Sequence, residues 1–90
     1  MVETWKHLEE NYYISNYGNV INRNSNRILK VIKCNDYKSK VTLTLENNSR
    51  KKDVFLASEV ARKFISEDFK RVYRIDKDVF NNRVDNIIVC

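Results

Sequence analysis

The strongest pattern in this 90-residue chain is a change in the spacing of its hydrophobic residues. Within Ser39–Glu46 apolar and polar residues alternate, which is typical of a strand with one buried face. Later the apolar residues recur at three- and four-residue steps, which predicts an amphipathic helix over about Leu56–Ser66, capped by Ser58 or Asp53. We expect one face of this helix to cover the core of a sheet. That face carries Ala57, Val60, Ala61, Phe64 and Ile65.

Turn residues define a hairpin in the first quarter of the chain. Tyr12–Ser15 and Asn19–Asn22 are rich in aromatic and β-branched residues and are predicted to be paired strands. They flank Asn16-Tyr17-Gly18, which contains the only glycine. Because a hairpin turn often needs one positive φ angle, we expect Gly18 to supply it.

Other segments are less regular. Ile28–Lys33 alternates in part and is predicted to be one strand. Another strand is expected to run from Arg50 towards Val54, after a turn at residues 47–49. The N-terminal run Val2–Glu10 has apolar residues at three-residue steps, which predicts a turn of helix or an irregular arm. Trp5 within it is expected to anchor the core, because large aromatic residues dominate burial in small proteins.

Composition excludes several classes of protein. There is neither a signal peptide nor an apolar run near the ~20 residues of a membrane span, so we expect a soluble protein of the cytoplasm or the host nucleus. Cys34 and Cys90 are expected to be free thiols in a reducing compartment. With His7 as the single histidine, we predict no zinc site, no other metal and no cofactor. Twelve asparagines and no proline suggest an AT-rich coding genome, as in many viruses and phages.

Positive charge is concentrated in one part of the chain. The protein carries a net charge of +5, whereas residues 21–52 alone contain nine basic and two acidic residues. Such a segment is a candidate for contacting nucleic-acid phosphates. A solvated, lysine-rich surface explains the same composition equally well. The candidate DNA-binding residues, two of them from the C-terminal region, are Arg23, Arg27, Lys30, Lys33, Arg50, Lys51, Lys52, Arg74 and Arg83.

Two motifs resemble a known family of nucleases. The first is Tyr-Ile-Ser-Asn-Tyr-Gly at residues 13–18, and the second is Asn-Asn-Arg-Val-Asp-Asn-Ile at residues 81–87. With the predicted helix between them, they are similar to phage-type HNH homing endonucleases, in which a nuclease-associated modular domain precedes a ββα-metal catalytic unit. The resemblance covers nearly the whole chain.

Pattern and resemblance together predict the architecture. We expect an α+β fold with a small antiparallel sheet of about five strands, one main helix and a truncated HNH-like strand–loop–strand at the C-terminus. Residues 1–90 are expected to form a single compact domain. Its β-rich modular part would span residues 1–53, and the helix with a degenerate HNH-like remnant would span residues 54–90.

The resemblance also indicates which catalytic parts are replaced. In the family an Asp-His or Asn-His pair ends the first catalytic strand, where the histidine is the general base and the acid holds the metal. Tyr73 and Arg74 occupy these places here, and a guanidinium neither accepts a proton at neutral pH nor attracts a metal cation. The family's metal-binding helix would begin beyond Cys90. The loop between the two strands is expected to be shaped by Asp76, Asn81, Asn82 and Asn86.

These observations predict that the chain is not an enzyme and has no catalytic residues. The first hypothesis is a virus- or mobile-element-derived protein that binds double-stranded DNA on a disarmed HNH scaffold. The alternative is a virus-encoded inhibitor or adaptor that binds a host defence or immune protein through an exposed apolar patch. Residual metal-dependent nuclease activity is a third hypothesis. The candidate residues for the protein-binding patch are Tyr37, Phe69, Tyr73 and Phe80.

Overall fold

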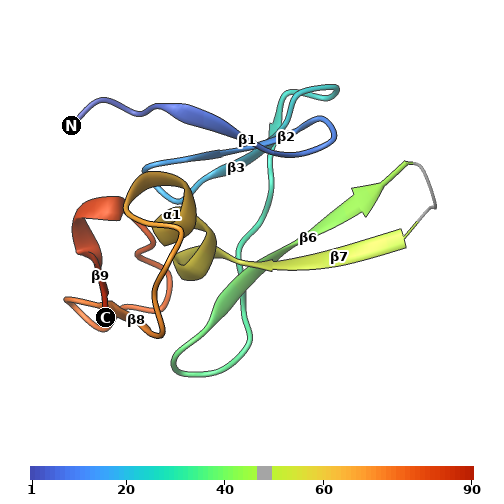
Figure 1. The fold of residues 1–90 in the computed structure, drawn as a ribbon. Coiled ribbons are helices and arrows are strands. Elements are labelled where there is room, and N and C mark those ends of the chain that lie inside the picture. Colours follow the sequence, from blue (N-terminus) through green and yellow to red (C-terminus); the bar gives the residue numbers. More distant parts are fainter. Residues whose placement is uncertain (47–49) are drawn as a thin grey trace.

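The computed structural model describes residues 1–46 and 50–90, and it has the predicted α+β fold. In these residues nine short strands form three antiparallel sheets, and one α-helix packs against them (Figure 1). The expectation of one sheet of about five strands is therefore wrong, because the strands are divided among sheets of four, three and two. The predicted turn at Asn47–Ser49 lies outside the described residues.

The N-terminal sheet contains four strands in the order β1-β2-β3-β4. They are β1 (Trp5–Glu9), β2 (Tyr12–Ser15), β3 (Val20–Asn22) and β4 (Arg27–Ile28). The predicted hairpin of β2 and β3 is confirmed. The predicted helical turn or irregular arm over residues 2–10 is wrong, because β1 pairs with β2 along its length.

The central sheet contains β5 (Ile32–Lys33), β6 (Ser39–Leu45) and β7 (Arg50–Phe55). The predicted alternation in β6 is confirmed: Val41 and Leu43 are fully buried, and Thr44 is exposed. Residues 28–33 do not form one strand, because Ile28 ends β4 in the N-terminal sheet and Ile32 begins β5 here. Figure 1 shows the β6–β7 hairpin running out from the body, away from α1 and from both termini.

The helix α1 spans Leu56–Phe64 and begins directly where β7 ends, so Phe55 is its N-cap and makes no side-chain capping bond. Both predicted caps are wrong. Asp53 lies within β7, where its carboxylate accepts hydrogen bonds from side chains of β6, and Ser58 lies inside the helix. The helix ends two residues earlier than predicted, which leaves Ile65 exposed.

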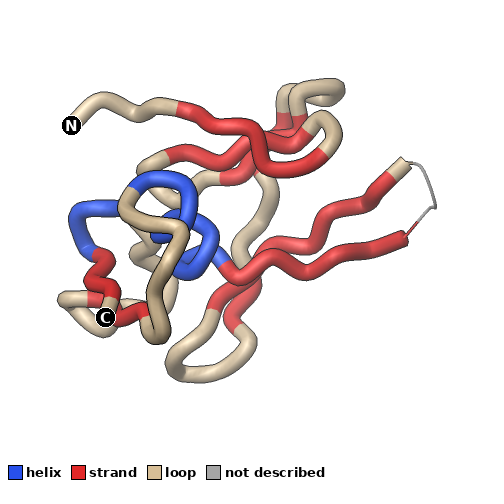
Figure 2. Tube along the Cα trace, in the orientation of Figure 1, coloured by secondary structure: helices blue, strands red, loops and turns tan. Residues whose placement is uncertain are grey.

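A short hairpin completes the chain. It consists of β8 (Val72–Arg74) and β9 (Ile87–Val89), with the 3-10 turn η1 (Val84–Asn86) immediately before β9. Figure 2 shows that most of the chain between these two strands is loop. The predicted C-terminal strand–loop–strand is therefore confirmed, and its loop must satisfy its backbone groups through side chains and turns.

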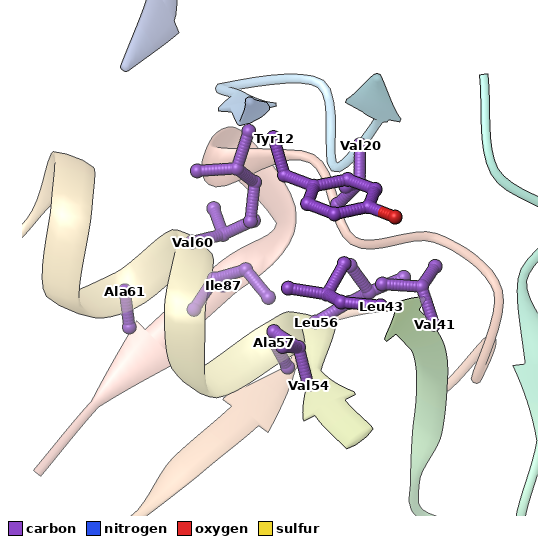
Figure 3. Close-up of a cluster of buried hydrophobic side chains, with 11 residues drawn as sticks. Tyr12, Val20, Val41, Leu43, Val54, Leu56, Ala57, Val60, Ala61 and Ile87 are labelled. Carbon is purple, nitrogen blue, oxygen red and sulfur yellow. The ribbon is translucent and has the colours of Figure 1, made fainter. Parts of the chain in front are cut away.

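The core is a cluster of eleven buried hydrophobic residues from all three sheets and α1. Figure 3 shows side chains of the helix facing those of the N-terminal and central sheets. Trp5 is half-buried and lies outside this cluster, so the prediction that it anchors the core is wrong. None of the described residues form a helix long and apolar enough to cross a membrane. The cluster comprises Tyr12, Ile14, Val20, Val41, Leu43, Val54, Leu56, Ala57, Val60, Ala61 and Ile87.

Candidate functional site

The two motifs that are far apart in the sequence are in contact in the fold. The Val84 amide donates a hydrogen bond of 2.8 Å to the Asn16 carbonyl oxygen. The Arg83 guanidinium carbon lies 4.4 Å from the centre of the Tyr17 ring, a cation–π contact. The turn between β2 and β3 is thus packed against the chain that leads into η1.

Asn16 also fixes the N-terminal residues to this turn. Its side-chain oxygen accepts from the Thr4 amide at 2.8 Å, and its side-chain nitrogen donates to the Val2 carbonyl at 3.0 Å. The Asn16 amide donates to the Thr4 carbonyl oxygen at 3.1 Å. Because Asn16 is buried, these bonds satisfy polar groups that would be costly to leave unpaired.

The loop between β8 and β9 is organised around the carboxylate of Asp76. One oxygen accepts from the Asp78 amide and the Asn86 side chain, both at 2.9 Å, and the other accepts from the Asn81 side chain at 2.7 Å. These donors hold the pKa of Asp76 below its usual range, the Asp78 amide having the largest effect. The predicted role of Asp76, Asn81 and Asn86 in shaping this loop is confirmed by these bonds.

Arg74 is held by three partners at the end of β8. Its guanidinium donates to the Asn82 side-chain oxygen through Nε at 3.1 Å, to the Tyr37 carbonyl through Nη1 at 2.9 Å, and to the Ser39 hydroxyl through Nη2 at 3.2 Å. Burial lowers the pKa of Arg74, and the nearby carboxylates of Asp78 and Asp76 oppose this shift. Arg74 therefore joins the C-terminal hairpin to β6.

Ser39 is the partner that sequence reasoning missed. Its hydroxyl is buried and donates to the Val79 carbonyl at 2.7 Å, while it accepts from Arg74 and from the Asn82 side chain. The signal was a hydroxyl at an inward position of an otherwise apolar alternating strand. A buried hydroxyl needs partners, so such a position predicts a polar contact but not its identity.

The chemistry available at Arg74 follows from its donors. A guanidinium has five N–H donors and no acceptor, so it can bind an anion or hold a loop but cannot act as a general base. Within residues 1–46 and 50–90 no group of three or more His, Cys, Asp or Glu side chains is placed to hold a metal ion.

Several of the candidate DNA-binding residues already have a carboxylate partner. Ion pairs join Lys33 to Asp36 at 3.3 Å, Lys52 to Glu9 at 2.6 Å and Arg83 to Asp85 at 3.3 Å. Lys40, a basic residue of the same segment that was not a candidate, pairs with Asp53 at 2.6 Å. The Lys40 contact lowers the pKa of Asp53 and raises that of Lys40. A basic residue paired with a carboxylate attracts a polyanion such as DNA less strongly than an unpaired basic residue does, because the charges of the pair cancel.

Apart from the partly buried Arg74, the other candidates are exposed, and they make no ion pair in the part of the chain that the structure describes. Arg50 and Lys51 lie on β7 in the projecting hairpin, and Arg27 and Lys30 lie in β4 and just after it. Arg23, in the turn just after β3, has its guanidinium 5.6 Å from the Tyr13 ring centre. Two exposed basic groups thus lie on the N-terminal and central sheets.

This fold is similar to that of a solved structure. It is described as "DNA binding and cleavage by the HNH homing endonuclease I-HmuI", and it matches with a TM-score of 0.78 and 24% sequence identity. The match covers 97% of this chain and 52% of that chain, so the chain spans about half the length of the endonuclease. No family model and no curated protein matches the sequence. The predicted HNH endonuclease-like fold is confirmed.

The same match contradicts the prediction that the chain is not an enzyme. The matched structure is that of an endonuclease, and this chain aligns with about half of it. The prediction treated the end of the sequence at Cys90 as evidence that the metal-binding helix is lost. Because this chain spans only about half of the endonuclease, the position of Cys90 is no evidence for that loss. The Arg74 side chain cannot act as a general base, but this does not establish that the protein is inactive.

Proposed function

We propose that this chain binds double-stranded DNA as part of an HNH-type endonuclease, through basic side chains that contact the phosphate backbone. The observation that carries this proposal is the projecting β6–β7 hairpin, on which Arg50 and Lys51 are exposed and without a carboxylate partner among the described residues. The likeness in fold to a homing endonuclease whose described activity is DNA binding and cleavage supports it.

Shape supports this assignment as well as charge. A two-stranded ribbon fits the major groove of B-form DNA, which is about 12 Å wide. Basic side chains on such a ribbon would meet the phosphates that border the groove. Arg27 and Lys30 would extend the contact along the backbone, because they belong to the neighbouring sheet and its connection to β5.

Arg74 and Arg83 have a different role in this proposal. Arg74 is occupied by Asn82, Tyr37 and Ser39, and Arg83 is occupied by Asp85 and the Tyr17 ring. We assign them to holding the C-terminal loop rather than to contacting phosphates.

The direct test is titration of a labelled duplex by fluorescence anisotropy at low salt. We expect a dissociation constant tighter than about 100 μM, the weak end of nonspecific DNA binding. The double variant Arg50→Ala/Lys51→Ala should bind more weakly than the double variant Lys33→Ala/Lys40→Ala, which removes the same charge from ion-paired positions. Absence of binding tighter than about 100 μM in the unaltered chain would overturn the proposal.

A protein-binding role has less support. Tyr37, Tyr73 and Phe80 are exposed and Phe69 is half-buried, so the aromatic residues expected for such a patch are largely accessible. No protein partner is named by the matched structure, whereas DNA is. Recovery of a specific protein complex that excludes DNA would favour this alternative over the first.

Cleavage requires its own assay. Nicking of supercoiled plasmid with Mg²⁺ or Mn²⁺ can be measured on the protein used for the titration. If nicking occurs and is lost in both Asp76→Ala and Asp78→Ala while DNA binding persists, the loop between β8 and β9 contributes to the reaction.

A further inference from the structure

A hollow of about 410 Å³ lies beside the C-terminal hairpin, away from the projecting β6–β7 tip. Its size falls in the range of about 300–1,000 Å³ that is usual for small-ligand sites. Two of its walls are tyrosines with large exposed fractions, 82% for Tyr37 and 48% for Tyr73. The hollow is lined by Asp36, Tyr37, Val72, Tyr73, Arg74 and Lys77.

The backbone that carries Tyr37 is fixed although its ring is exposed. The Tyr37 amide donates to the Asn35 side-chain oxygen at 2.8 Å, and the Cys34 amide donates to the Lys38 carbonyl at 2.9 Å. The Tyr37 carbonyl accepts from Arg74 at 2.9 Å. An exposed aromatic ring on a fixed backbone can bind a partner with a smaller loss of conformational freedom than one on a loose segment.

The two tyrosine rings are not stacked on each other. In the residues that the structure describes, the aromatic pair in ring contact is His7 with Tyr13. Both residues line the hollow, so a planar group that enters it can contact either side chain.

The charge around the hollow favours a planar group attached to an anion. Arg74 and Lys77 line it on the positive side. Asp36 is the acidic lining residue, and Lys33 lies 3.3 Å from its carboxylate. Arg74 adds positive charge, but its donors are bonded to Asn82, Tyr37 and Ser39, so Lys77 is the basic group placed to contact a phosphate. A nucleotide combines an aromatic base with a phosphate, which matches the tyrosines and Lys77.

We propose that this hollow receives one unstacked nucleobase of bound DNA, with Tyr37 and Tyr73 against the base and Lys77 beside the adjoining phosphate. The inference rests on the proposed DNA binding and adds a specific ligand, a base outside the helical stack. Aromatic side chains bind any base through its π-face, so the site would tolerate different bases. An unpaired base costs less to unstack than a paired one, so the DNA structure should matter more than its sequence.

The test compares two duplexes of the same sequence, one fully paired and one with a single bulged adenine. The unaltered chain should bind the bulged duplex about tenfold more tightly, because the cost of opening a base pair is absent. Tyr37→Ala should remove most of this preference, and Tyr37→Phe should retain it, because the ring is what stacks. Phe80→Ala is the matched control, since Phe80 is an exposed aromatic residue that does not line the hollow.

The outcomes separate this inference from the proposed function. In Tyr37→Ala, binding to the fully paired duplex should stay within about twofold of the unaltered chain, because its phosphate contacts are elsewhere. Equal binding of both duplexes by the unaltered chain would overturn the base site and leave DNA binding intact. Preference for the bulge that survives Tyr37→Ala, or is lost equally in Phe80→Ala, would also overturn it. Failure to bind either duplex would overturn both proposals.

Discussion

Gly18 and Asn82 are packed so closely that a Cβ atom on residue 18 would lie 2.6 Å from the Asn82 Cβ and 2.8 Å from its carbonyl oxygen. Gly18 also has a φ angle of +82°, which an L side chain rarely adopts. Both the backbone angle and the close contact therefore require glycine. Asn82 in turn accepts the hydrogen bond from Arg74, so the turn of the N-terminal hairpin supports the loop of the C-terminal one.

Gly18→Ala should destabilise the fold by about 2–4 kcal/mol, because the new methyl group meets backbone atoms of residue 82 and also strains its own φ angle. Chemical denaturation followed by circular dichroism measures this change. Asn26→Ala is a matched control, since Asn26 has a φ of +56° in an exposed turn. The control should cost only about 1 kcal/mol, and equal losses in the two variants would contradict the close-packing argument.

Arg74 and Asn82 should show energetic coupling. Either Arg74→Ala or Asn82→Ala leaves partners of a buried network unsatisfied, and each should cost about 2 kcal/mol. The double variant should lose less than the sum of the two, with a coupling energy of about 1 kcal/mol. Unfolding free energies of the four proteins in the cycle measure it. The pair Arg62 and Asn82 serves as a control, because Arg62 forms its ion pair with Glu59, and the two changes should be additive within about 0.5 kcal/mol.

The regular elements could be predicted because their burial follows a simple period. The alternation in β6 is confirmed, and the predicted helical stripe is buried at Ala57, Val60 and Ala61 but not at Ile65. The N-terminal strand β1 was missed because its register shifts between His7 and Glu9, and a bulge breaks the two-residue period. The prediction of one strand over Ile28–Lys33 failed for a different reason. The apolar pattern of a segment does not indicate that its two ends pair with different sheets.

Only the contacts between residues close in the sequence could be predicted for the candidate site. The asparagines that bond to Asp76 lie five and ten residues away, within the same loop. The contacts of Arg74 with Tyr37 and Ser39 join residues 37 and 35 positions apart, and no short-range pattern encodes them. Arg74 was therefore predicted to face DNA, whereas in the fold its donors are directed to the protein.

The stability of the fold should fall at acidic pH, because the Asp76 carboxylate becomes protonated there. Its donors lower the pKa of Asp76 in the folded chain, so its carboxylate stabilises the fold above the unfolded value of about 3.9. That stabilisation is lost as the pH falls through the lower, folded-state pKa. Asp76→Asn should therefore lower the melting temperature at neutral pH, and the difference from the unaltered chain should shrink towards about pH 2.

A second variant tests whether the hydrogen bonds cause this dependence. Asn86→Ala removes one donor to Asp76, so the loss of stability at acidic pH should be shallower than in the unaltered chain. Melting temperatures measured at several pH values for the three proteins are sufficient. A difference between Asp76→Asn and the unaltered chain that stays constant down to about pH 2 would show that Asp76 acts through packing alone.

The salt dependence of the DNA-binding constant should show how many basic residues contact phosphates. Arg27, Lys30, Arg50 and Lys51 make no ion pair among the described residues, and four phosphate contacts give a slope of log K against log salt near about −3.6. Replacing both Arg50 and Lys51 by alanine should reduce the slope by about 1.8. Replacing Lys33 and Lys40 removes the same formal charge, but their carboxylate partners already oppose them, so the slope should change much less. An equal change in the two double variants would mean that net charge, and not the projecting hairpin, determines binding.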